Sequence, residues 1–140
     1  MQRILTLLVL AAASSPLAAQ DSAQAAAPAA SALTVGTAVV ARSVVDRVPQ
    51  DTGSTFPADV GQLVCFTEIQ GAAADAPATV HHVWFRGETQ VADVSLEVRG
   101  SPWRTWSRKT VPADWTGPWH VEIRDDAGTV LKRIEFTVGP

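Results

Sequence analysis

The stretch Pro102-Trp103-Arg104-Thr105-Trp106-Ser107-Arg108-Lys109-Thr110-Val111 decides how the chain is interpreted. Successive side chains of a β-strand point to opposite faces. At that period, one face carries Trp103, Thr105, Ser107, Lys109 and Val111, and the other carries Arg104, Trp106, Arg108 and Thr110. Both faces therefore carry a tryptophan and a cation. Two neighbouring tryptophans on opposite faces cannot both be buried in one core, so we expect one of them at an edge or on the surface.

Short apolar runs recur on both sides of this stretch between Gly, Pro and Asp residues, a pattern typical of an all-β domain. We expect strands at 60–69, 79–86, 89–98, 102–111, 117–124 and 129–138, and one long or two broken strands within 35–48. The segment 49–57 is expected to be a loop. In the last strand, Val130, Ile134, Phe136 and Val138 should share one side. About seven strands over 33–140 predict a single antiparallel, immunoglobulin-like β-sandwich, with a β-barrel as the alternative.

The N-terminal segment has the features of a secretory leader. Residues 1–19 combine the basic Arg3 with an apolar run over 4–13 and end in small residues, as a cleaved signal peptide does. That run is too short to span a bilayer, so a retained membrane anchor is the weaker alternative. Residues 20–32 are rich in small and polar residues and predict a flexible linker. We therefore expect an exported chain, periplasmic or extracellular, without a stable membrane span after cleavage.

Charge and cysteine content narrow the classes of function. The whole chain has a net charge of −3, and removal of Arg3 with the leader leaves 10 basic and 14 acidic residues, or −4. A weakly acidic domain lacks the basic footprint of a nucleic-acid-binding protein. Cys65 is the only cysteine, so no internal disulfide can form. It lies in an apolar run and is expected to be a buried, inert thiol.

A local positive patch stands out on this acidic background. No acidic residue lies between Glu97 and Asp114, whereas Arg99, Arg104, Arg108 and Lys109 do. Guanidinium groups beside indole rings are suited to holding carboxylates, sulfates or sugar acids. The predicted ligand-binding residues are His82, Trp84, Arg104, Trp106, Lys109 and Trp119. The predicted function is a non-catalytic binding module for a cell-envelope carbohydrate, an anionic ligand or a partner protein.

Two other interpretations remain open. In the first, the same residues are structural: they pack across strands, and their cations pair with Asp93, Glu97 or Glu122 in a structural or assembly domain. In the second, the chain is a hydrolase or metalloprotein. His81 and His82 are adjacent in a strand and diverge, so neither a metal site nor a cofactor is predicted. Ser107 lacks the glycines of a nucleophile elbow, so no catalytic residue is predicted.

Four short motifs resemble a known family. They are His82-Val83-Trp84, Trp103-Arg104-Thr105-Trp106-Ser107-Arg108-Lys109, Gly117-Pro118-Trp119-His120-Val121 and Glu135-Phe136-Thr137-Val138. From about Val39 to Val138 the chain is similar to the bacterial family catalogued as domain of unknown function 2914. In that family the aromatic residue before the serine is often Tyr, where this chain has Trp106. The resemblance implies a compact all-β domain of exported or membrane-tethered bacterial proteins, and it implies no reaction and no ligand.

Overall fold

The computed structural model of the protein describes residues 32–140. The strands are β1 (Thr34–Ala41), β2 (Ser43–Val45), β3 (Val48–Gln50), β4 (Thr55–Phe56), β5 (Gly61–Gln70), β6 (Ala78–Arg86), β7 (Thr89–Val98), β8 (Trp103–Val111), β9 (Gly117–Asp125) and β10 (Val130–Val138). The predicted signal peptide, 1–19, and all of the predicted linker except residue 32 lie outside the described residues. Within the described part, no helix has the length and apolar character needed to cross a membrane.

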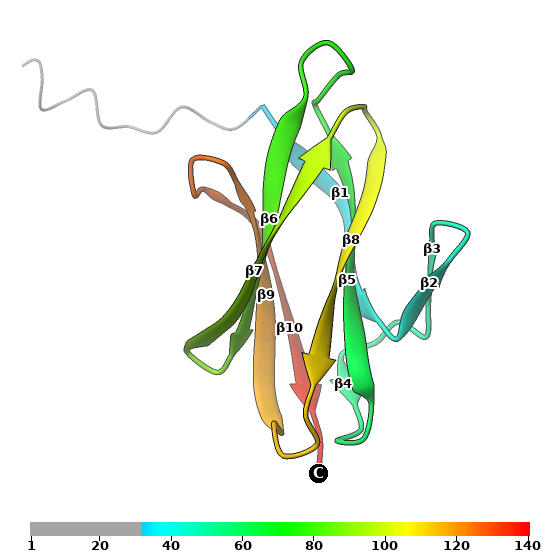
Figure 1. Cartoon of the computed structure of the whole chain (residues 1–140), viewed down its shortest axis with the longest axis vertical. Helices are drawn as coiled ribbons and strands as arrows, with labels where there is room; N and C mark the ends of the chain where they lie inside the picture. Colours follow the sequence, from blue (N-terminus) through cyan, green and yellow to red (C-terminus); the bar gives the residue numbers. More distant parts are fainter. Residues whose placement is uncertain (1–31) are drawn as a thin grey trace, which may run out of the picture.

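Two sheets pack face to face (Figure 1). One has the order β1-β5-β8, and the other has the order β4-β10-β9-β6-β7. Among the seven long strands, the first, second and fifth thus form one sheet, and the other four form the second sheet. This division is that of an immunoglobulin-like sandwich, in which the chain crosses between sheets in a Greek-key order. The predicted immunoglobulin-like, antiparallel β-sandwich is confirmed, and three short strands add to the seven that the sequence predicts.

The short strands correct the prediction over the first part of the domain. Within the segment 35–48, the long strand β1 ends at Ala41. The chain then forms the hairpin of β2 and β3. The predicted loop over 49–57 is wrong at both ends, because β3 continues to Gln50 and β4 pairs in parallel with the end of β10. Burial of Phe56 explains the second error. Its ring is 3% exposed and meets the ring of Phe136 edge-on at 6.1 Å, which holds the segment against β10.

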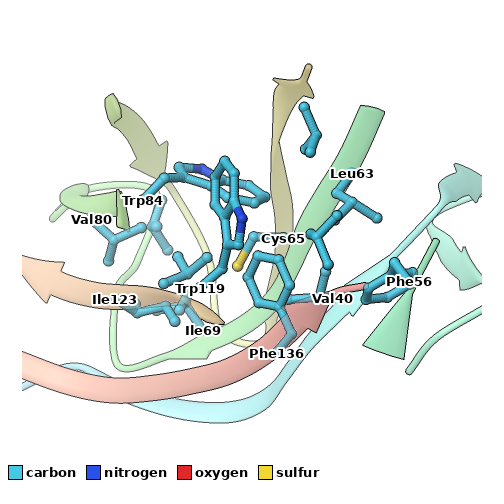
Figure 2. Packing of buried hydrophobic residues seen from close by; sticks show 14 of the residues in the cluster. Val40, Phe56, Leu63, Cys65, Ile69, Val80, Trp84, Trp119, Ile123 and Phe136 are labelled. Atoms are coloured by element: carbon cyan, nitrogen blue, oxygen red, sulfur yellow. The ribbon is translucent and has the colours of Figure 1, made fainter. Parts of the chain in front are cut away.

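The core lies between the two sheets and includes two of the five tryptophans (Figure 2). Trp84 of β6 and Trp119 of β9 both contact Phe136, with ring centroids 6.2 and 5.9 Å away. Cys65 points into the same cluster (Figure 2), and burial raises the pKa of its thiol. The prediction of a buried cysteine is confirmed. Full burial of an aromatic side chain contributes on the order of 2–3 kcal/mol, so these rings account for much of the core energy.

The last strand departs from simple alternation. The β9–β10 register shifts between Val130 and Lys132. As a result Leu131 packs against the core, while Val130 is 48% exposed. The predicted placement of Val130 on the apolar side is therefore wrong, because an extra residue in one strand reverses the facing of every side chain before it.

Candidate functional site

A groove of about 680 Å³ lies where β7 ends and β8 begins. It is lined by Arg47, Ser95, Leu96, Glu97, Pro102, Trp103, Arg104, Thr105 and Trp106. These residues come from the end of β7, the first half of β8 and the turn of the β2–β3 hairpin. The hairpin stands out from the three-stranded sheet on the side away from the five-stranded sheet (Figure 1). We refer to this hollow as the β7–β8 groove.

Strand β8 presents its two tryptophans to the groove from opposite faces. Trp103 is half-buried and packs against the main core. Trp106 is half-buried on the outer face, where it lies directly across from Phe66 of β5. The two rings are stacked, with centroids 6.2 Å apart and planes 16° apart. The prediction that the two indoles cannot both be buried in one core is confirmed.

Arg104 lies beside Trp106 on the outer face of the three-stranded sheet and is held there by a cross-strand neighbour. It is directly opposite Glu68 of β5, and its Nε lies 3.2 Å from Oε2 of that residue. This bond uses one of the five N–H donors of a guanidinium. The side chain of Arg104 is 49% exposed, so the other donors remain accessible from the groove.

The arginines of the basic patch form only some of the ion pairs that the structural interpretation predicts. Arg99 pairs with Glu97 at 2.9 Å, as that interpretation predicts. Arg104 instead uses Glu68, which precedes it by 36 residues, so that only the β5–β8 register reveals the pair. Within residues 32–140, Arg47 and Arg108 have no ion pair. The charged residues that line the groove are two arginines, Arg47 and Arg104, and one glutamate, Glu97.

Arg47 reaches the groove from a strained turn. Val45 pairs with Val48, so Asp46 and Arg47 form a two-residue hairpin turn. Both have positive φ values, 50° and 61°. Such a turn normally takes Asn-Gly or Asp-Gly, because residues other than Gly, Asn and Asp rarely adopt positive φ values. A bulky cation thus occupies a position where glycine would be less strained.

Three of the six predicted ligand-binding residues are in the interior, and for these the prediction is wrong. His82 and Trp84 are 0% exposed, and Trp119 is 2% exposed. They share the inward faces of β6 and β9, so their side chains fill the space between the sheets (Figure 2 for the two tryptophans). Arg104 and Trp106 lie together on the outer face of the other sheet. The predicted single surface therefore separates into a core cluster and an outer pair.

The buried polar atoms of the core cluster form one directed chain of hydrogen bonds. Thr67 Oγ1 donates to the carbonyl oxygen of Thr105 at 3.2 Å, so it can only accept from Nε2 of His82, 3.1 Å away. The neutral imidazole then carries its proton on Nε2, and Nδ1 accepts from the Ser107 hydroxyl at 2.7 Å. Ser107 in turn accepts from Nε1 of Trp84 at 3.1 Å. Every donor is used, and burial lowers the pKa of His82 to about 4, which keeps the ring neutral.

This network joins the two sheets but offers no route to a substrate. Its His82–Ser107 contact has the residue types of a catalytic dyad. Ser107 is only 4% exposed, however, and His82 is sealed. A hydroxyl can attack a substrate only if the substrate can reach it. The arrangement is a polar link across the core of a domain that has no internal disulfide.

Lys109, the sixth predicted residue, lies away from the groove. It is on the inward side of β8, and its Nζ lies 5.4 Å from the ring centroid of Trp115. Arg86 of β6 also lies over this ring, at 5.6 Å. The carbonyl oxygen of Trp115 accepts from Nε1 of Trp119 at 3.0 Å, which fixes the loop. Lys109 therefore belongs to a cation–π cluster near the far end of β8, so its predicted grouping with Arg104 and Trp106 is wrong.

The other two histidines sit on the outer face of the five-stranded sheet. Nδ1 of His81 lies 3.0 Å from Asp93, and its Nε2 lies 3.2 Å from Asp126. The hydrogen bond to Asp93 is the main cause of a raised pKa for His81. His120 stacks on Phe85 with centroids 4.5 Å apart, and burial is the main cause of its lowered pKa. Among residues 32–140, no three or more His, Cys, Asp or Glu side chains converge as metal ligands would.

Several groove residues were not predicted as ligand-binding. Arg47 could have been found from the order Val45-Asp46-Arg47-Val48, in which two valines enclose a two-residue turn. Leu96 and Glu97 give no such signal, because their place beside β8 depends on how the two sheets meet.

Comparison with known protein families covers eight of the nine residues that line the groove, all except Arg47. Residues 77–138 match the family model described as "Protein of unknown function (DUF2914)". The resemblance to DUF2914 is confirmed. The DUF2914 match covers β7 and β8 but begins well after Val39, so β1 to β5 lie outside it. The description of DUF2914 carries no reaction and no ligand.

No curated protein matches the chain. Among solved structures, an immunoglobulin-like protein from Pseudomonas aeruginosa is similar, at 14% identity and a TM-score of 0.43. The similarity covers 76% of this chain and 90% of that protein.

Proposed function

We propose that the chain is a non-catalytic binding module that holds a carboxylate-bearing ligand of the cell envelope in the β7–β8 groove. The observation that carries this proposal is the lining of the groove, in which two indoles, Trp103 and Trp106, lie with two guanidinium groups, Arg47 and Arg104. A concave surface with apolar walls and a few convergent polar groups is the usual form of a ligand site.

The charges around the groove favour an anionic ligand. Glu97 and Glu68 are each already paired with an arginine, whereas Arg47 has no ion pair within residues 32–140. A guanidinium can hold a carboxylate through two parallel N–H···O bonds, which gives both energy and orientation. Because the groove is open to solvent, these interactions should weaken as salt is added.

The leader-like sequence supports the cellular setting of the proposal. Residues 1–19 have the composition of a signal peptide, and an exported chain meets the acidic saccharides and proteins of the envelope. Both the acidic saccharides and the acidic proteins carry carboxylate groups. The experiment below therefore includes one acidic polysaccharide and one acidic polypeptide.

A structural function accounts for the core cluster but not for the groove. His82, Trp84 and Trp119 are buried, and their burial needs no ligand. Arg104 and Trp106, by contrast, lie on an outer face beside a hollow. A purely structural domain would gain little from Arg47 in a turn that suits glycine.

Binding by a matched set of variants tests the proposal. The purified chain, an Arg104→Ala, Trp106→Ala double variant and a Lys132→Ala control would be titrated with polygalacturonate and with poly-glutamate, by calorimetry and by tryptophan fluorescence. Lys132 is an exposed cation of β10 outside the groove. We expect the double variant to lose at least tenfold in affinity for the ligand that binds while it still melts cooperatively, and the control to bind normally. Equal binding by all three proteins would show that the groove is not the site.

A further inference from the structure

The lining of the β7–β8 groove shows that it runs along strand edges. Five consecutive residues of the β8 segment, Pro102 to Trp106, and three consecutive residues of β7, Ser95 to Glu97, contribute to it. A hollow on the face of a sheet would collect every second residue, because successive side chains point to opposite faces. Consecutive residues are collected only where the hollow lies against the edge of a strand. The backbone of β8 and β7 therefore borders the groove.

Both bordering strands are terminal in their sheets. β8 is the last strand of the order β1-β5-β8, and β7 is the last strand of the order β4-β10-β9-β6-β7. Within residues 32–140, no backbone pairing joins β7 to β8. An edge strand leaves the N–H and C=O groups of alternate residues without a neighbouring strand. The groove is thus bordered on two sides by backbone that can accept another strand.

The side chains beside the β8 edge differ between its two faces. On the inner side, Trp103 and Leu96 are half-buried apolar groups that pack against the margin of the core. On the outer side lie Arg104, the half-buried ring of Trp106 and, from the hairpin, Arg47. A strand added along this edge would alternate in the same way. Its inward side chains would meet the apolar pair, and its outward side chains would meet the guanidinium groups.

We propose that the β7–β8 groove binds an extended segment of a partner protein, which adds to the edge of β8 as a fourth strand of the three-stranded sheet and alternates acidic with apolar residues. This inference rests on the proposed function and specifies its ligand. β8 is the receiving edge, because it supplies Arg104 and both indoles of the groove, whereas β7 supplies no cation to it. Main-chain hydrogen bonds supply affinity in this mode of recognition, and the alternate side chains supply specificity.

Synthetic peptides test the proposal directly on the purified chain. The probe is the capped heptapeptide Glu-Val-Glu-Val-Glu-Val-Glu. Three controls have the same length: a block peptide of identical composition, a Gln-for-Glu peptide, and a peptide N-methylated at alternate amides. We expect the affinity of the chain for the probe peptide to exceed its affinity for each control peptide by at least tenfold. Arg104→Ala should remove most of the preference for Glu over Gln, and Lys132→Ala should leave it unchanged.

Hydrogen exchange supplies a readout of strand addition that charge alone would not change. On binding the probe, amides of alternate residues within 103–107 should become at least tenfold better protected, and the amides of β1 should not change. Equal binding of the block peptide, or binding without this protection, would overturn the proposal.

The other occupants give different results. Binding of polygalacturonate that depends on Arg104 and Trp106, with no binding of the heptapeptide, would refute strand addition and leave the proposed function standing. Concentration-dependent dimerisation that protects the same amides without peptide would make a second copy the occupant and would also refute it. Binding of neither polygalacturonate nor any peptide would refute both proposals.

Discussion

The side chains of Ser107 and His82 meet at 2.7 Å between Oγ and Nδ1, and this hydrogen bond connects β8 of one sheet with β6 of the other. Trp84 completes one end of the network and Thr67 the other. A protonated His82 would carry N–H groups on both nitrogens, so the Ser107 hydroxyl could no longer donate to Nδ1. The link between the sheets therefore depends on a neutral imidazole.

Stability should consequently fall in mild acid. Burial lowers the pKa of His82 from 6.5 to about 4, so between these values the unfolded chain binds a proton that the folded chain does not. The contribution of His82 is complete above about pH 6.5 and is lost as the pH falls toward 4. This separation of pKa values corresponds to about 3 kcal/mol of unfolding free energy. Urea unfolding between pH 4.5 and 7.5 would measure it.

A His82→Gln variant is the matched control, because glutamine is neutral throughout this range. We expect it to be less stable than the wild type at pH 7.5 and to lack the His82 contribution to the slope. The raised pKa of His81 gives the opposite slope and is present in both proteins, so it cancels in the difference. Parallel pH profiles for the two proteins would contradict the prediction.

Removal of the Ser107 hydroxyl should cost more than its size suggests. In Ser107→Ala, Nδ1 of His82 and Nε1 of Trp84 both lose their hydrogen-bond partner inside the core. An unsatisfied buried polar group costs about 1–3 kcal/mol, so we expect a loss of about 2–4 kcal/mol. Chemical denaturation measures this loss, with the exposed Ser95→Ala as the control, for which a change within about 0.5 kcal/mol is expected. A similar small loss for both variants would show that the network does not stabilise the fold.

The sequence predicts the strands better than it predicts which side chains meet. Period-two alternation correctly separates Trp103 from Trp106, because that property is local to one strand. Trp84 is buried because the three-stranded sheet covers its face of β6. Alternation along β6 shows which residues share that face, but it does not show whether another sheet or a ligand covers it. Arg104 and Glu68 meet through the β5–β8 register, and Arg47 reaches the groove through the position of a hairpin. These are consequences of long-range packing, so the separation of the predicted site into two clusters could not be seen from the sequence.

The two kinds of tryptophan should respond differently to substitution. Trp84→Ala removes a sealed side chain and should lower the unfolding free energy by about 3–5 kcal/mol. Trp106→Ala removes a half-buried ring whose stacking partner is Phe66, and a loss of about 1–2 kcal/mol is expected. Thermal and urea melts of the two variants measure the difference. A loss for Trp106→Ala as large as that for Trp84→Ala would favour a structural function for the outer pair.

Replacement of Arg47 by glycine should separate stability from binding. Arg47 has a φ of 61° in a two-residue turn after Asp46, and Asp-Gly is a preferred pair for such a turn. Arg47→Gly should therefore raise the unfolding free energy, by up to about 1 kcal/mol, because glycine adopts this conformation without steric penalty. The same change removes a cation from the groove and should weaken binding of the Glu-Val heptapeptide at least threefold. Arg108→Gly, a glycine substitution within a strand, should instead lower stability. A variant at position 47 that gains stability and binds as well as the wild type would show that the strained arginine does not contact the ligand.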